Sequence, residues 1–207
     1  MTLNPTLRRL GLALAIVVLL YAFGLAVYNS RQRLSATTFN PPRALASAHT
    51  SLLTANGSIT LHQLKGNLVL LFIGYTNCPD YCPNTLSSLR RAITLLTPQE
   101  AAQVKVLFIS VDPQRDPPEK LAAYATAFNP AFMGALVASQ PELDALVAEI
   151  GAYYKLGQPD QNGFYAVEHS TNLMVLNRAG ELAAFWGYGT QPANIAADLR
   201  LLLRQQE

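Results

Sequence analysis

Two cysteines, Cys78 and Cys82, are the only thiols in the chain and stand four residues apart. They follow the apolar run 67–75, which predicts a buried strand, and the proline-rich segment after that run indicates the start of a helix. Residues four apart share one helix face, so the two sulfurs are expected side by side at a strand-to-helix turn. A helix N-terminus lowers a thiol pKa and favours the thiolate. This arrangement predicts either a reversible disulfide or a clamp for a soft metal ion.

The elements that would position these thiols alternate between strands and helices. We expect a hairpin over 52–61, strands over 68–75 and 104–111, helices over 84–96, 118–128 and 141–154, an antiparallel pair over 172–176 and 181–186, and a closing helix over 192–203. This order is typical of an α/β fold, a thioredoxin-like sandwich with a mixed central sheet flanked by helices. The cysteines then fall at the carboxyl end of the first core strand, where ligands gather in open α/β sheets.

One of the three histidines, His169, is the candidate third ligand. It ends the loop 157–168 and opens the strand at 172, a position that faces the cysteine turn in this fold. His49 and His62 favour a solvated or capping role. Two thiolates and one imidazole form a set that selects Cu(I) and can also hold Cu(II). Zinc in a closed structural site would need a fourth ligand, for which Asp80 and Asp112 are the candidates.

Asp112 has two interpretations of equal weight. It follows the second core strand at the sheet edge that carries the cysteines, where a carboxylate could orient His169 or hold positive charge near a metal. It also precedes Pro113, where an aspartate commonly caps a turn. The neighbouring Arg115 and Asp116 are expected to form a local ion pair of little energetic weight.

Disulfide exchange is the competing chemistry. Its usual signature is C-x-x-C, whereas the spacing here is C-x-x-x-C. Thioredoxin-like oxidoreductases also place a cis-proline opposite the cysteines, and the corresponding stretch 168–172 has no proline. These two differences favour metal binding over exchange. A peroxiredoxin-like peroxidase is a further alternative, but the threonine and proline before Cys82 stand at the wrong offsets for it.

The N-terminal segment predicts a membrane anchor. Residues 10–30 carry no charge, and about 20 such residues in a helix span roughly 30 Å, the thickness of a bilayer core. We expect an anchor over 1–30 with its N-terminus in the cytoplasm, a tether over 31–49 and the folded domain over 50–207. A cleaved signal peptide, with a poor site at 22–24, is the alternative.

Either interpretation places the domain outside the cytoplasm, where cysteines normally form structural disulfides. A bridge across so short a loop would stabilise the fold weakly, so a purely structural role explains the pair poorly. The formal net charge of +2, without a basic patch interleaved with aromatics, argues against nucleic acid as a partner.

The chain resembles the SCO/SenC family of membrane-anchored copper chaperones for cytochrome c oxidase. The stretches that carry the resemblance are 66–75, 76–83, 108–116 and 165–170, and the likeness extends from about 52 to 203. It implies copper ligation by Cys78, Cys82 and His169. Asn77 departs from the family pattern, in which many members have histidine before the first cysteine, and Glu168 replaces a common aspartate.

The resemblance also implies the function and the partners. The protein would be a single-pass protein of the inner or plasma membrane with its C-terminal domain on the periplasmic side. It would receive copper from an upstream donor and deliver it to the dinuclear copper centre of the oxidase's copper-bearing subunit. Such a protein is a metallochaperone rather than an enzyme. The alternative is a thiol-disulfide reductase, with Cys78 and Cys82 as its redox pair, that acts on the cysteines of that subunit.

Overall fold

The computed structural model describes residues 5–31, 34–161 and 163–204, with the side chains of 12–25 in the first helix. The chain divides into two units, 1–34 and 35–207. The first unit contains α1 (Pro5–Arg31). Within the described residues, no helix is both long and apolar enough to cross a membrane. The predicted span 10–30 extends past these described side chains at both ends, and the anchor stays a prediction.

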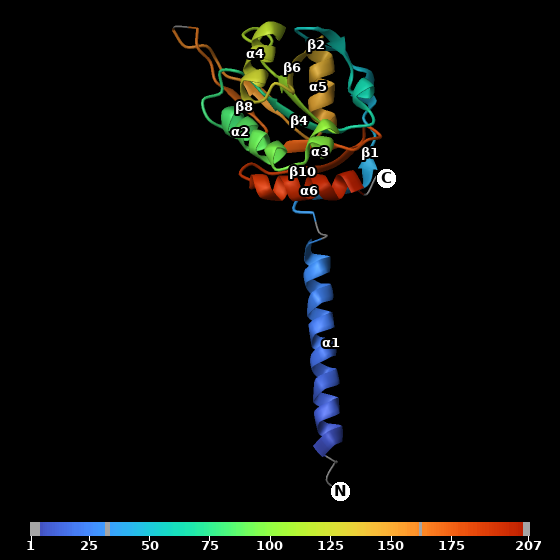
Figure 1. Cartoon of the computed structure of the whole chain (residues 1–207). Helices are drawn as coiled ribbons and strands as arrows, with labels where there is room; N and C mark the ends of the chain where they lie inside the picture. Colours follow the sequence, from blue (N-terminus) through green and yellow to red (C-terminus); the bar gives the residue numbers. More distant parts are fainter. Residues whose placement is uncertain (1–4, 32–33, 162, 205–207) are drawn as a thin grey trace. The chain divides into compact units, whose positions relative to one another are not determined.

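The second unit is built on a mixed sheet of eight strands (Figure 1). Their order across the sheet is β1-β10-β9-β4-β5-β6-β2-β3. The strands are β1 (Thr37–Arg43), β2 (Leu52–Thr54), β3 (Gly57–Ile59), β4 (Leu68–Gly74), β5 (Val104–Ser110), β6 (Phe132–Val137), β9 (Leu173–Leu176) and β10 (Leu182–Trp186). A separate ribbon pairs β7 (Tyr154–Leu156) with β8 (Val167–His169). This arrangement of a mixed sheet with helices confirms the thioredoxin-like α/β prediction.

The strands β4, β5 and β6 are parallel neighbours, and helices connect them. The helices of this unit are α2 (Tyr81–Thr94), α3 (Pro98–Ala102), α4 (Pro118–Phe128), α5 (Gln140–Glu149) and α6 (Pro192–Arg204), with short 3₁₀ turns η1 (Ala46–His49) and η2 (Leu61–Leu64). Crossovers between parallel strands are right-handed. Because β4, β5 and β6 follow one another in the same direction across the sheet, α2 and α4 share one face of it, and the two helices are in contact.

The central strand β4 is buried at all seven residues. Such continuous burial is expected for a parallel strand that is covered on both faces. The apolar side of α2, formed by Leu86, Leu89 and Ala92, is also buried. The strand and the helix therefore fix both ends of the turn that carries the two cysteines.

Several of the predicted elements differ from the structure. Residues from Ser35 onward belong to the folded unit, and β1 pairs with β10, so most of the expected tether 31–49 is structured. Ser35 is held by the buried carboxylate of Asp198, which also accepts from Trp186 Nε1 at 2.8 Å. The expected helix 141–154 ends at Glu149, before Gly151 at φ +69°. The strands β6, β7 and β8 and the short helix α3 were missed. In β6 the apolar run is interrupted by Gly134, and a glycine inside a strand weakens its pattern.

Candidate metal centre

The two cysteines differ in their positions at the start of α2. Cys78 lies in the turn between β4 and the helix, where its amide donates to the Tyr75 carbonyl at 3.2 Å. Cys82 is the second residue of α2. Cys78 is 7% exposed and Cys82 is fully buried. Only one of the two sulfurs is therefore open to the surface.

Gly74, the last residue of β4, makes room for the Cys82 sulfur. A Cβ at this position would lie 2.4 Å from Cys82 Sγ and 2.8 Å from Phe108 Cε2. Both distances are far below van der Waals contact. Glycine is needed here because the sulfur occupies the space next to the strand where a side chain would otherwise stand.

His169 is held by the β7–β8 ribbon, in which it pairs with Tyr154. Its Nδ1 lies 2.8 Å from the Ser170 carbonyl oxygen. A carbonyl can only accept a hydrogen bond, so Nδ1 carries the proton and Nε2 has a free lone pair. The ring also stands edge-on to Tyr75, with centroids 5.9 Å apart. The tautomer and the orientation are both those of a metal ligand.

The structure brings all three predicted ligands together. The two Sγ atoms and one imidazole nitrogen lie within 4.8 Å of one another, and His169 Nε2 is 3.6 Å from Cys82 Sγ. Metal–sulfur bonds of about 2.3 Å place two sulfurs on one ion at most about 4.6 Å apart. The donor set therefore fits a single soft ion with little movement. Among the described residues, no other histidine, cysteine or carboxylate joins the group, Asp80 and Asp112 included.

The two thiols share one proton in an unequal way. A hydrogen bond from the Cys82 thiol lowers the pKa of Cys78 to about 4, and hydrogen bonds from backbone amides act in the same direction against the effect of burial. The same bond, together with burial, raises the pKa of Cys82. At neutral pH the pair therefore consists of a Cys78 thiolate and a Cys82 thiol.

Asp116 positions the turn before Cys78. Its buried carboxylate accepts from the Thr76 amide at 2.8 Å and from Ser110 Oγ at 2.7 Å. Lys120 contacts this carboxylate at 3.2 Å and also donates to Asn77 Oδ1 at 3.0 Å. The ion pair expected between Arg115 and Asp116 is wrong, because Asp116 pairs with Lys120. The carboxylate instead fastens Thr76 to Ser110 at the end of β5, and Lys120 of α4 holds Asn77.

Asp112 is fully buried, but its partners are not those of a residue that orients His169. One carboxylate oxygen accepts from Arg115 Nε, and the other accepts from the Tyr165 hydroxyl at 2.6 Å. Arg115 also donates to the Tyr165 carbonyl at 2.8 Å, and its guanidinium lies 3.6 Å from the Tyr165 ring centre. Orientation of His169, one of the roles considered for Asp112, falls instead to the Ser170 carbonyl, which accepts from Nδ1. Asp112 and Arg115 fix the segment that leads into β8.

The centre opens into a cavity of about 500 Å³, lined by residues that include Cys78, Tyr81, Tyr153 and His169. Asp80 and Glu168 also line it, and among the described residues no lysine or arginine does. A cation can therefore approach Cys78 and His169 from the surface without meeting positive charge.

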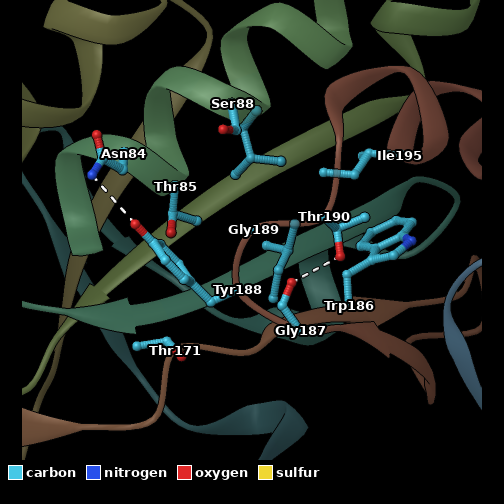
Figure 2. A pocket seen from close by; sticks show the side chains of 12 residues that line it. Asn84, Thr85, Ser88, Thr171, Trp186, Gly187, Tyr188, Gly189, Thr190 and Ile195 are labelled. Atoms are coloured by element: carbon cyan, nitrogen blue, oxygen red, sulfur yellow. Dashed lines mark hydrogen bonds between the residues drawn. The ribbon is translucent and has the colours of Figure 1, made fainter. Parts of the chain in front are cut away.

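A smaller cleft of about 120 Å³ lies beside this cavity and shares Thr171 with it. Figure 2 shows the Asn84 amide facing the Tyr188 hydroxyl, 3.3 Å away, across one end of the cleft. The cleft contains hydroxyl and amide groups but no titratable group apart from Tyr188. The cleft therefore has no nucleophile or acid–base pair from which a second active site could be built.

Sequence reasoning missed the supporting residues Gly74, Thr76 and Tyr75. The sequence does contain one indication of the first, since a glycine that ends a fully apolar strand commonly marks a close approach. The hydrogen-bond partners of Thr76 and Ser110 depend on how α4 packs beside β5. The sequence pattern carries no information on that packing.

Comparisons with known proteins agree with this site. The family model described as SCO1/SenC matches residues 40–204. A candidate copper-binding protein of Stutzerimonas stutzeri is 33% identical over 178 residues, which cover 86% of this chain and 85% of that protein. The mitochondrial SCO1 homologue of Mus musculus is 30% identical over 156 residues. This match covers 74% of the chain but only 55% of the mouse protein.

A solved structure, that of Bradyrhizobium japonicum ScoI with copper bound, superposes with a TM-score of 0.67 at 30% identity. The match covers 74% of this chain and 96% of that protein.

The first prediction concerns Gly74. Gly74→Ala should lower the free energy of unfolding of the reduced protein by about 1–3 kcal/mol, because the new methyl group overpacks Cys82 and Phe108. Urea unfolding measures this difference. Gly187→Ala is the matched control, since nothing lies within 4 Å of the Cβ it would add, and its effect should stay within about 0.5 kcal/mol. Equal effects of the two substitutions would contradict the close packing at Gly74.

The second prediction concerns thiol reactivity. Cys78 should be alkylated before Cys82, and its rate should stay nearly constant as the pH falls from 8 toward 5, because its pKa of about 4 keeps it a thiolate there. In the urea-unfolded chain both rates should instead fall roughly tenfold per pH unit below the ordinary pKa of about 8.5. Iodoacetamide labelling with mass spectrometry distinguishes the two sites. Modification of Cys82 first across this range would overturn the assignment.

Proposed function

This chain belongs to the SCO1/SenC family, and on that premise we propose that it is a copper chaperone. It binds one copper ion as cargo through Cys78, Cys82 and His169 and delivers it to the dinuclear copper centre of cytochrome c oxidase. The observation that carries this proposal is the convergence of two sulfurs and one imidazole nitrogen within 4.8 Å. The copper bound to the Bradyrhizobium japonicum relative supports the choice of metal.

The three donor groups suit a soft metal ion that is first bound and then transferred to a recipient protein. Thiolates select Cu(I), and the imidazole extends the range to Cu(II). One thiol is already deprotonated and the imidazole has its lone pair free, so binding requires the loss of one proton, from Cys82. Because the cavity is open next to Cys78 and His169, an incoming ligand of the recipient protein can replace these two donors before the buried sulfur.

A second candidate function is thiol-disulfide reduction of the recipient's cysteines, and the lowered pKa of Cys78 favours it. The Cys78 thiolate would attack a substrate disulfide and form a mixed disulfide, releasing one substrate thiolate. Cys82 would lose its proton to that thiolate and attack Cys78, which frees the second substrate sulfur. The two electrons that reduce the substrate come from the two cysteines, which end as a disulfide. Both functions use the same two cysteines, but only copper binding needs the imidazole of His169, so a substitution of His169 distinguishes the two functions.

The third prediction therefore concerns His169. The reduced protein should bind one Cu(I), and the oxidised protein almost none, because a disulfide offers no thiolate. His169→Ala should lower Cu(I) affinity by at least roughly tenfold while the Cys78–Cys82 disulfide still forms. Competition with bicinchoninate at pH 7 measures the affinity.

The exposed His62 provides the matched control, and His62→Ala should retain the affinity of the unchanged protein. Equal copper uptake by reduced and oxidised protein would refute the chaperone assignment. A His169→Ala variant that keeps full copper affinity but loses thiol exchange would favour the reductase.

We also propose that residues 10–30 anchor the protein in the membrane and that the domain lies on the outer side. The support is the uncharged sequence of this segment and the helix α1 that contains it. The folded unit begins at Ser35, so only residues 32–34 separate it from the helix.

The fourth prediction tests this anchor. The full chain should remain with membranes after a carbonate wash, because an apolar span of this length holds a protein in the bilayer. A chain that begins at Ser35 should be soluble. Protease added from the outer side should digest the domain. A mature N-terminus near residue 25, or release by carbonate, would refute the anchor and leave the metal centre untouched.

A further inference from the structure

Four exposed aromatic side chains surround the mouth of the metal centre. Two of them, Tyr81 and Tyr153, line the cavity that leads to Cys78. A third, Tyr188, packs edge-on against Tyr81, with ring centres 4.9 Å apart. Its hydroxyl accepts from the Asn84 amide of α2, as Figure 2 shows. These tyrosines therefore form a continuous edge beside the cavity.

The fourth side chain, Phe164, stands in the segment before β8 and is also exposed. Its ring centre lies 5.9 Å from the Arg115 guanidinium, which lies 5.6 Å from the ring of Tyr75 in the cavity wall. Among the described residues of the folded unit, no other phenylalanine, tyrosine or tryptophan is exposed. We call Tyr81, Tyr153, Phe164 and Tyr188 the aromatic rim.

The aromatic rim has the composition of a protein contact surface. Each of its side chains is between 45% and 59% exposed, so the core recovers only part of their apolar area. Apolar side chains that gather on one exposed face mark interaction sites. Tyrosine is enriched at protein–protein interfaces, since it buries a large ring at low cost in conformational entropy and keeps a hydroxyl for hydrogen bonds.

The depth of the ligands determines the form of the partner. Cys78 lines the cavity but is only 7% exposed, and Cys82 is fully buried. A flat protein surface that rests on the aromatic rim cannot reach either sulfur. A protein that takes copper from this centre must therefore insert a loop that carries a metal ligand of its own.

The charge of the cavity favours a positive partner. Asp80 and Glu168 line it, and neither forms an ion pair among the described residues. Lys155 stands opposite Glu168 in the β7–β8 ribbon, so Asp80 carries the less compensated charge. Copper does not reverse the sign, because its ligands bind as thiolates and one Cu(I) on two thiolates keeps a negative charge. The mouth of the centre therefore attracts cationic side chains before and after loading.

We propose that the aromatic rim is the docking surface for the protein that receives the copper, and that this recipient inserts a ligand-bearing loop flanked by lysine or arginine. The inference rests on the proposed chaperone function. The rings supply the apolar contact that holds the two proteins together, and the two carboxylates steer their encounter.

The fifth prediction compares two acceptors of Cu(I) from the loaded, reduced full chain in detergent. One acceptor is the soluble copper domain of the oxidase's copper-bearing subunit, below saturation. The other is bicinchoninate, a small chelator that needs no docking surface. Phe164→Ala combined with Tyr188→Ala should slow transfer to the oxidase domain at least roughly tenfold, because interface aromatics carry much of the binding energy. Neither residue lines the metal cavity, so transfer to bicinchoninate should keep its rate. Stopped-flow absorbance measures both rates.

Leu53→Ala combined with Leu95→Ala is the matched control, since both leucines are exposed away from the aromatic rim. Leu95 follows the last residue of α2, about 20 Å along the helix from Cys82, and Leu53 lies on β2, three positions from β4 in the sheet. This variant should transfer copper to both acceptors at the unchanged rate. The proposal is overturned if the two double variants slow transfer equally, if Phe164→Ala with Tyr188→Ala has no effect, or if it slows transfer to bicinchoninate as much.

Asp80→Asn combined with Glu168→Gln tests the charge. Transfer from the unchanged chain to the oxidase domain should slow as salt rises from about 20 mM to about 200 mM, and less steeply in this variant. A rate independent of salt would refute the positive partner. A dimer in sedimentation that Tyr188→Ala dissociates would assign the aromatic rim to a second copy of the chain and overturn the proposal. Failure of the chaperone function is distinguishable, because the unchanged chain would then pass no copper to the oxidase domain, and the docking inference would be refuted with it.

Discussion

The close approach of the Cys82 sulfur to β4 is the constraint on which the metal centre depends. The strand is buried along its whole length, and its last residue, Gly74, leaves the space that the sulfur fills. The hydrogen bond between the two sulfurs, together with burial, then keeps the proton on Cys82 and leaves Cys78 as the thiolate. The inequality of the two thiols is thus a consequence of packing.

Two buried carboxylates hold the segments that carry the ligands, without touching the ligands themselves. Asp116 fastens Thr76, two residues before Cys78. Asp112, through Arg115 and Tyr165, fastens the chain that leads to His169. A buried carboxylate is costly unless it is fully paired, and loss of either one would leave several buried donors without a partner. Both lie at the end of β5, next to the carboxyl end of β4, so one edge of the sheet positions all three metal ligands.

The sequence predicted what depends on local pattern. The buried strand before Cys78 and the helix α4 have the expected bounds or nearly so, because long apolar runs and an N-terminal proline are strong local indications. His169 could be selected because its place in the chain follows from the order of the elements. The strand β1 could not be predicted, because its exposed residues 37–43 carry no alternation and pair only through β10. The sequence left two interpretations of Asp112 open, because its bond to Tyr165 joins distant segments and depends on their distance in space and not on their order in the chain.

The protonation of His169, Cys78 and Cys82 determines which proton must leave before the site can bind copper or form a disulfide. His169 holds its proton on Nδ1, away from the ligands, and needs no rearrangement to coordinate. Cys78 has already lost its proton. Only Cys82 must lose one, and it does so in the most buried part of the site, where charge is least well solvated. Disulfide formation needs the same event, because Cys82 attacks as a thiolate. Copper binding and thiol exchange therefore have this one costly step in common. What separates the two functions is the imidazole, which coordinates a metal but takes no part in moving electrons between sulfurs.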